Sequence, residues 1–167
     1  MPIYTSLLGE LKNESANTRK MIERIPTEKL EWRPHNKSMS IGTLATHIAN
    51  LPVWFDRIIN AEGFEMVSSG SSQKKESTEA ILEQFSQRLH EAEQALVRAT
   101  SDEMFKGLWA LSRNGQTVFQ LPKMIAIRSF AFNHIYHHRG QLSVYRVCWI
   151  FLYLECMDLL QMKNKTL

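Results

Sequence analysis

The chain has 167 residues, of which 44% are hydrophobic and 22% charged, and its net charge at pH 7 is +3. This length suits one domain with a continuous core, and the composition is that of a folded protein rather than a disordered one. Lysine and arginine are scattered instead of forming a stripe, which argues against nucleic-acid binding. Because neither a secretory leader nor a long apolar run is present, we expect a cytoplasmic protein without a membrane partner.

The first half of the chain predicts two amphipathic helices. Apolar residues at helical spacing indicate one from about Ile3 to Ile25 and a second from Ile41 to about Ala61. Ser38 or Ser40 can cap the second helix, because a serine oxygen accepts hydrogen bonds from the first free backbone N–H groups. The connector between the helices contains Trp32, which we expect to anchor it to the core.

The second half predicts a loop, a third helix, a turn and a fourth helix. The segment from Ser68 to Glu76 is small and polar and reads as a flexible loop. Ser77 or Thr78 can cap the third helix, Asn114-Gly115 between apolar runs predicts a β-hairpin or extended turn, and Pro122 should open the fourth helix. The sequence therefore predicts an all-α fold, an up-down four-helix bundle with this small hairpin between the third and fourth helices.

Three of the six histidines fall within five residues of the fourth helix, at His134, His137 and His138. Residues four apart lie on one face of a helix, so His134 and His138 can direct two imidazoles toward one point. The apolar residues Ile127 and Leu142 continue the same stripe, which predicts that this face is turned toward the core. His137 lies about 100° round the helix from His138 and should lie outside the site. The rival pair, His134 with His137, stays open at this point.

His47 is the only histidine of the predicted second helix and lies in its apolar stripe. Taken alone, it is better explained as a hydrogen-bonded core residue, since buried polar groups normally find an internal partner. The pair on the fourth helix changes that balance, because bundles build metal sites from facing helices and a catalytic divalent metal often has three protein ligands and one open position. We predict a site formed by His47, His134 and His138 plus water, suited to zinc, nickel or ferrous iron. His90 reads as a surface residue.

Several motifs resemble one known family. The segment from Asn133 to Tyr145, which contains HHRGQ, resembles the signature of the DinB/YfiT-like family, and Met39 to Ala49 resembles that family's second-helix motif. The sequence from Trp32 to Pro34 is similar to its usual lead-in, and the resemblance covers about residues 1–146. It implies a four-helix bundle, often a homodimer, in which three histidines hold a divalent metal. By position these are His47, His134 and His138.

The resemblance also implies a range of functions. Similar members include S-transferases that conjugate low-molecular-weight thiols, and many members have no known reaction. We therefore expect a metal-dependent thiol transferase or a hydrolase-like enzyme that acts on small electrophiles, with a low-molecular-weight thiol as the co-substrate of the transferase. The alternatives are a catalytically silent, metal-binding stress-response bundle and a thiol-dependent isomerase. No residue outside the metal site is identified as catalytic.

The tail departs from the family pattern. Family members usually leave the fourth helix through a segment rich in proline and glycine, whereas this chain continues with an apolar run from Trp149 to Leu154. Codons can be chosen for Trp149 to Lys163 that encode DIPVPGMYGPSADE, a family-like tail, when the first two bases are dropped. Our hypothesis is a one-base frameshift, in the gene or its reading, just before Cys148. Residues 1–147 would then be the domain and 148–167 an atypical tail.

The altered tail has physical consequences. Without proline or glycine to end it, the fourth helix should continue past Val147. The run from Trp149 to Leu154 should be an exposed apolar patch unless it packs on the bundle or a partner. Cys148 and Cys156 would be frameshift products, and their spacing suggests neither a disulfide framework nor a thiolate metal site. An intact frame in the resequenced gene, with the same tail in homologous chains, would contradict the frameshift.

Overall fold

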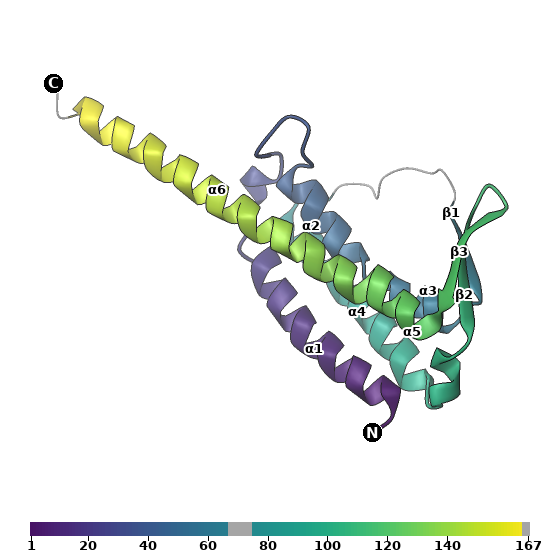
Figure 1. Cartoon of the computed structure of the whole chain (residues 1–167). Coiled ribbons are helices and arrows are strands. Elements are labelled where there is room, and N and C mark those ends of the chain that lie inside the picture. The colour runs from purple at the N-terminus through teal and green to yellow at the C-terminus, as the bar shows by residue number, and fades with distance from the viewer. Residues whose placement is uncertain (67–74, 165–167) are drawn as a thin grey trace.

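The computed structural model describes residues 1–66 and 75–164, with side chains described as far as Trp149. It is mostly helical with a small three-stranded sheet (Figure 1). The helices and strands are α1 (Ile3–Ile22), α2 (Ile41–Asn50), α3 (Val53–Ile59), β1 (Gly63–Met66), α4 (Thr78–Arg98), β2 (Leu108–Arg113), β3 (Gln116–Pro122), α5 (Lys123–Ala126) and α6 (Asn133–Asn164). Two 3-10 turns, η1 (Thr27–Lys29) and η2 (Asp102–Phe105), and a π-helical turn, η3 (Ile127–Phe132), complete the order.

The long helical segments pack in a closed order, in which α1 and α2 each contact both α4 and α6. Gln84 of α4 bonds to the carbonyl of Thr46 in α2, and Arg98 of α4 pairs with Asp56 in α3. The later residue of the α2–α3 segment contacts the later residue of α4, so the α2–α3 segment runs parallel to α4. The alternating up-down direction expected from the sequence is wrong at this point, because the α2–α3 segment and α4 run in the same direction.

Two groups of buried side chains form the core. The group at the sheet end includes Phe55, Trp109 and Phe132, all fully buried. The second group includes Leu44 and Phe85, and Trp32 packs against it with its ring 6.0 Å from the ring of Tyr145. The predicted anchoring of the connector by Trp32 is therefore confirmed.

The predicted hairpin is present as β2 and β3. Asn114 and Gly115 both have positive φ, 52° and 74°, as a tight hairpin turn of this hand requires. The sequence did not predict β1, which pairs parallel to β2 with Gly63 opposite Ala110. A side chain at Gly63 would lie 2.7 Å from the Ala110 carbonyl oxygen, so glycine permits this close approach.

Several predicted helix boundaries need correction. The first helix ends at Ile22, before the expected Ile25, and the second is divided at Pro52 into α2 and α3. Proline has no backbone N–H, so a continuous helix loses a hydrogen bond at this residue. Pro122 is the last residue of β3 rather than the first of a helix. Ser40 and Ser77 are the caps of α2 and α4, as predicted. The predicted loop from Ser68 to Glu76 lies largely outside the described residues.

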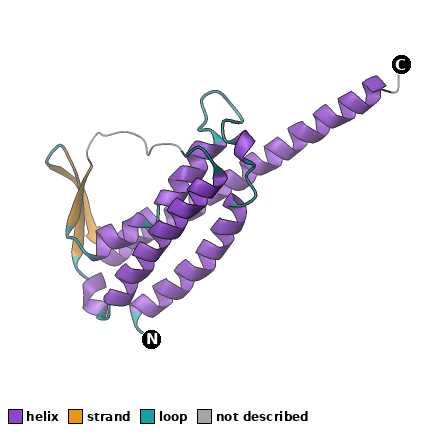
Figure 2. Ribbon diagram, turned by 180° about the vertical axis from the view of Figure 1, so that it is seen from behind, coloured by secondary structure: helices purple, strands orange, loops and turns teal. Residues whose placement is uncertain are grey.

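Helix α6 runs on to Asn164, which confirms that the fourth helix continues past Val147. Figures 1 and 2 both show its C-terminal half extending away from the other helices, at the opposite end from the sheet. The predicted patch from Trp149 to Leu154 falls, apart from Trp149, on side chains outside those described. No helix in the described part of the chain has the length and hydropathy needed to cross a membrane.

Candidate metal centre

Three histidines from two facing helices come together in the structure. The Nε2 atoms of His47 on α2 and His134 on α6 are 3.2 Å apart. The ring of His138 is centred 4.5 Å from that of His47 and 4.7 Å from that of His134. One candidate ligand atom from each residue can be chosen so that all lie within 4.8 Å of one another. All three side chains are partly exposed, whereas the sequence predicted a buried face.

The other two histidines with predicted positions lie outside this cluster. His137 is exposed, although its ring centre is 4.9 Å from that of His138. The structure therefore brings together His134 and His138, four residues apart, rather than the rival pair with His137. His90 on α4 is also exposed, as the sequence predicted.

Hydrogen bonds fix the orientation of both histidines on α6. Nδ1 of His138 is 2.6 Å from Oε1 of Gln141, and because an amide oxygen only accepts, Nδ1 carries the proton and Nε2 keeps its lone pair. His134 bonds to the backbone of Phe130, within the π-helical turn that precedes α6. Such partners hold a ligand's ring and tautomer in place. The sequence analysis missed the role of Gln141, although its position three residues after His138 was a usable signal.

The environment keeps the three imidazoles neutral. Burial, followed by the neighbouring His138 and His134, lowers the pKa of His47 from its ordinary value to about 4. Burial is also the largest cause of the lowered pKa of His134 and of His138. A neutral imidazole has a free lone pair, so these shifts favour metal binding. Within the described residues no carboxylate belongs to the cluster, which is a set of three nitrogen donors.

Comparison with known proteins identifies the family of this chain. The model of the DinB family matches residues 1–146. The chain belongs to the DinB family. A DinB-like protein from Bacillus cereus has a similar structure, with a TM-score of 0.65 and 20% sequence identity over 83% of this chain and 87% of that chain. A protein from Exiguobacterium sibiricum, described as a candidate DinB member, has a TM-score of 0.60 and 19% identity over 89% of this chain and 93% of that chain. No curated protein matches the sequence.

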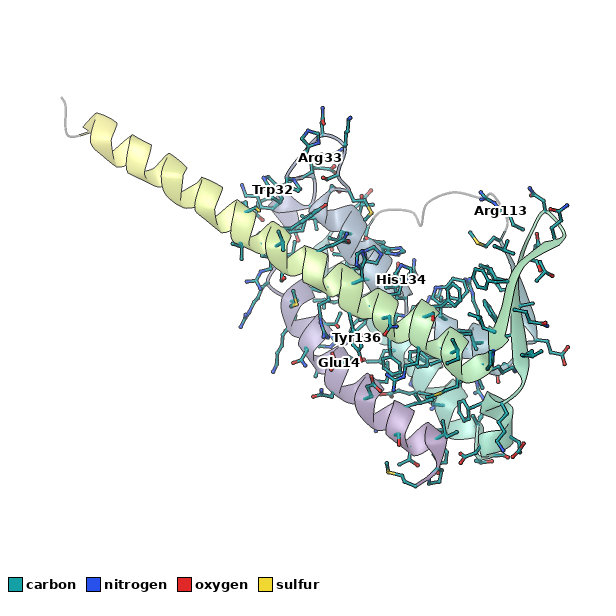
Figure 3. All side chains as sticks on the ribbon, in the orientation of Figure 1. Glu14, Trp32, Arg33, Arg113, His134 and Tyr136 are labelled. Carbon is teal, nitrogen blue, oxygen red and sulfur yellow. The ribbon has the colours of Figure 1, made fainter. Side chains whose placement is uncertain are left out.

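In this DinB protein, ion pairs hold η3 and the opposite face of α6 against α1. Arg128 makes two hydrogen bonds, of 2.6 and 2.7 Å, to the carboxylate of Glu10, which also accepts a 2.6 Å bond from the Tyr136 hydroxyl. Arg139 lies 2.6 Å from Glu14. Figure 3 shows Tyr136 and Glu14 on facing sides of α6 and α1. These contacts fix the rotation of α6, and with it the direction of His134 and His138.

The contacts on this face shift the pKa values of two of its side chains. The hydrogen bond from Arg128 lowers the pKa of Glu10, and burial followed by the bond to Glu10 raises the pKa of Tyr136. The sequence analysis did not identify this network. Its signal was the spacing of Glu10 and Glu14 on the first helix opposite Arg128 and Arg139 on the fourth.

The metal-free DinB protein should lose stability as the pH falls from about 6.5 to about 4. The His47 side chain has a folded pKa of about 4, whereas an unfolded histidine titrates near about 6.5. Below that pH the unfolded state takes up protons that the folded state does not, so the free energy of unfolding decreases. Urea denaturation at a series of pH values measures this slope. His47→Gln should flatten it, and an equal slope in both proteins would contradict the neutral state of His47.

Removing the amide of Gln141 should weaken metal binding. In Gln141→Leu, His138 loses the acceptor that fixes its ring and tautomer, so the zinc dissociation constant should rise by about 10- to 100-fold. Zinc competition with a chromophoric chelator measures it. Ser143→Ala is the matched control, because Ser143 is exposed and bonds only to the Gly140 carbonyl. Equal zinc affinity in the wild type and Gln141→Leu would show that Gln141 does not position His138.

Proposed function

We propose that His47, His134 and His138 bind one divalent transition-metal ion and that the protein is a metal-dependent thiol S-transferase acting on small electrophiles. The observation that carries this proposal is the convergence of three neutral imidazoles from two helices. Zinc with nitrogen ligands at 2.0–2.1 Å in a tetrahedral arrangement places two such nitrogens about 3.3 Å apart. The 3.2 Å between the Nε2 atoms of His47 and His134 fits this spacing.

The donor set also favours particular metals. Imidazole nitrogen suits zinc, nickel and ferrous iron, whereas magnesium and calcium prefer oxygen ligands. Three neutral imidazoles leave the charge of the ion uncompensated, and an ion so held would lower the pKa of a bound thiol or water. A low-molecular-weight thiol is the proposed co-substrate. A hydrolase-like reaction would use water in its place.

The protein's own residues bind and orient. The three histidines are partly exposed, so a thiol and an electrophile can both approach. Gln141 and the backbone of Phe130 keep the rings of His138 and His134 directed toward the cluster. Since no carboxylate belongs to the cluster among the described residues, we do not assign a protein general base.

A dye-conjugation assay tests this proposal. Metal-loaded protein is mixed with a panel of low-molecular-weight thiols and 1-chloro-2,4-dinitrobenzene, in which the thiol sulfur bonds to the ring carbon and chloride leaves. We expect conjugation above the uncatalysed rate that is lost in chelator-treated protein and in His134→Ala. Metal binding without conjugation of any thiol would contradict the transferase and favour a catalytically silent metal-binding protein. Thiol-dependent isomerisation of a cis-enedioic acid, without net thiol consumption, would favour the isomerase.

We also propose that the protein is cytoplasmic and that, by resemblance to its family, it is a homodimer. Sedimentation velocity of the full chain distinguishes a dimer from a monomer. A monomer throughout the micromolar range would contradict the proposed assembly.

A further inference from the structure

Aromatic side chains lie within about two helical turns of the histidines along the chain. Trp54 on α3 follows His47 on α2 along the chain, and Phe130 in the π-helical turn η3 precedes His134 by four residues. The two rings are centred 5.4 Å apart, so α3 and η3, which adjoin the two helices that supply the histidines, meet through aromatic rings. Phe119 from β3 stacks on Phe130, with its ring centre 5.4 Å away and the ring planes 14° apart. These three rings are partly exposed.

Arg57 adds a positive charge to this surface. Its guanidinium carbon is 5.2 Å from the ring centre of Trp54 and 4.3 Å from that of Phe64 on β1. The backbone is fixed here, since the indole N–H of the buried Trp109 donates a 3.1 Å hydrogen bond to the carbonyl of Arg57. Burial, and then the charge of Arg88, lowers the pKa of Arg57. The guanidinium is therefore partly desolvated and held against two aromatic faces.

Within the described residues, the Arg57 side chain forms no ion pair and donates no hydrogen bond. The charge of the adjacent carboxylate, Asp56, acts to raise the pKa of Arg57, but its direct contacts are with Arg98, 3.7 Å away, and with Asn60, from which it accepts a hydrogen bond. Three other partly buried arginines each pair with a carboxylate, Arg88 with Glu91, Arg128 with Glu10 and Arg139 with Glu14, whereas Arg19 donates a 2.6 Å hydrogen bond to the Ser86 hydroxyl. Partial burial of a cation that is not directly paired with an anion costs free energy unless another group neutralises its charge. Arg57 is thus a charge in this region that a ligand can neutralise.

We propose that Trp54, Phe64, Phe119, Phe130 and Arg57 form the substrate-binding surface for a small molecule with an apolar or aromatic body and a carboxylate. The carboxylate pairs with Arg57, the body lies on the rings, and the reacting end lies at the three histidines. At the helical rise, the positions of His47 and Arg57 are about 15 Å apart along the α2–α3 segment. The ligand is therefore an extended carboxylate. This inference rests on the proposed function, because it places the reacting end at the same histidines.

A matched pair of ligands tests the charge. 2-Naphthoate and 2-naphthylmethanol share an aromatic body, but only the first carries a carboxylate. We expect isothermal titration of the metal-free protein to show that naphthoate binds at least about tenfold more tightly, since hydrogen bonds to charged groups are stronger than neutral ones. Arg57→Met should abolish this preference and leave naphthylmethanol binding unchanged. Phe130→Leu should weaken both ligands.

Arg113→Met is the matched control. It removes the same charge from an exposed residue of β2, and Figure 3 shows Arg113 at the hairpin, away from α6. This variant should keep the preference for naphthoate. Equal binding of the two ligands by the wild type, or a preference that survives in Arg57→Met, would overturn the proposal. A lower melting temperature of Arg57→Met with the preference intact would show that Arg57 only links α3 to β1.

The titration separates this inference from the proposed function. Because the protein is metal-free, a preference for naphthoate does not depend on metal binding. If the preference is found but no metal binds to the histidines, the proposed reaction fails and the carboxylate surface stands. If metal binds but the two ligands bind equally, the carboxylate surface fails and the metal site stands.

Discussion

Replacing His134 with alanine should weaken zinc binding by more than about 100-fold, because loss of a ligand should cost more than the 10- to 100-fold typical of losing an outer partner. The Nε2 atoms of His134 and His47 are 3.2 Å apart, and this substitution removes one of these two nitrogen donors. Binding to the folded state alone raises stability by about 2.7 kcal/mol at a ligand concentration of 100 times the dissociation constant. The zinc-dependent rise in melting temperature seen for the wild type should therefore be absent in His134→Ala.

His137→Ala is the matched control for this prediction. It removes a histidine from the same helix, three residues away, whose side chain is exposed and outside the cluster. Its zinc affinity and thermal shift should equal those of the wild type. Similar losses in the two variants would indicate that zinc binds to exposed histidines of α6 rather than at the site shared with α2.

Replacing Phe55 with alanine should reduce the free energy of unfolding by about 3–5 kcal/mol, the usual cost of truncating a buried phenylalanine. Phe55 is fully buried on α3, and its ring lies edge-on to Phe132 with centres 5.0 Å apart. Phe132 ends the π-helical turn just before α6, so the cavity would form beside the segment that positions His134. Urea denaturation at neutral pH measures the loss.

Val118→Ala provides the comparison for Phe55→Ala. Val118 is on β3 and its side chain is 56% exposed, so its truncation should change stability by less than about 0.5 kcal/mol. A loss below about 1 kcal/mol for Phe55→Ala would contradict a close-packed core at the sheet end.

The elements with strong local signals could be predicted from the sequence. The four-residue spacing of His134 and His138 indicated a shared helix face, and the isolated position of His47 in an apolar stripe indicated the facing partner. Asn114-Gly115 specified the hairpin, because these residue types tolerate positive φ. Each of these predictions depends on neighbouring residues and not on the packing of distant elements.

The rest depends on contacts between distant residues. The parallel course of the α2–α3 segment and α4 follows from the path of the chain, which helical periodicity does not encode. Strand β1 is short and mostly exposed, so it has little alternation of its own and forms by pairing with β2. The π-helical turn from Ile127 to Phe132 has no sequence signature that we recognised. Arg57 stood out only when the contacts of its guanidinium with the rings of Trp54 and Phe64, and the pairing of Asp56 with Arg98, were known.

The origin of the tail is a question that the gene sequence answers. The family match ends at residue 146, where the chain begins to depart from the family pattern. The backbone of α6 continues as a helix beyond this point, as expected for a segment without proline or glycine. The frameshift stays a hypothesis that the gene sequence decides.

A crystal structure of the zinc-loaded protein, with anomalous diffraction data collected at the zinc edge, tests the central claim most directly. We expect one anomalous peak per chain, bonded at about 2.0–2.3 Å by one nitrogen each of His47, His134 and His138. Gln141 should still accept the hydrogen bond from Nδ1 of His138. A fully loaded protein whose peak lies on His137 or His90, or a site at which these three histidines have separated, would contradict it.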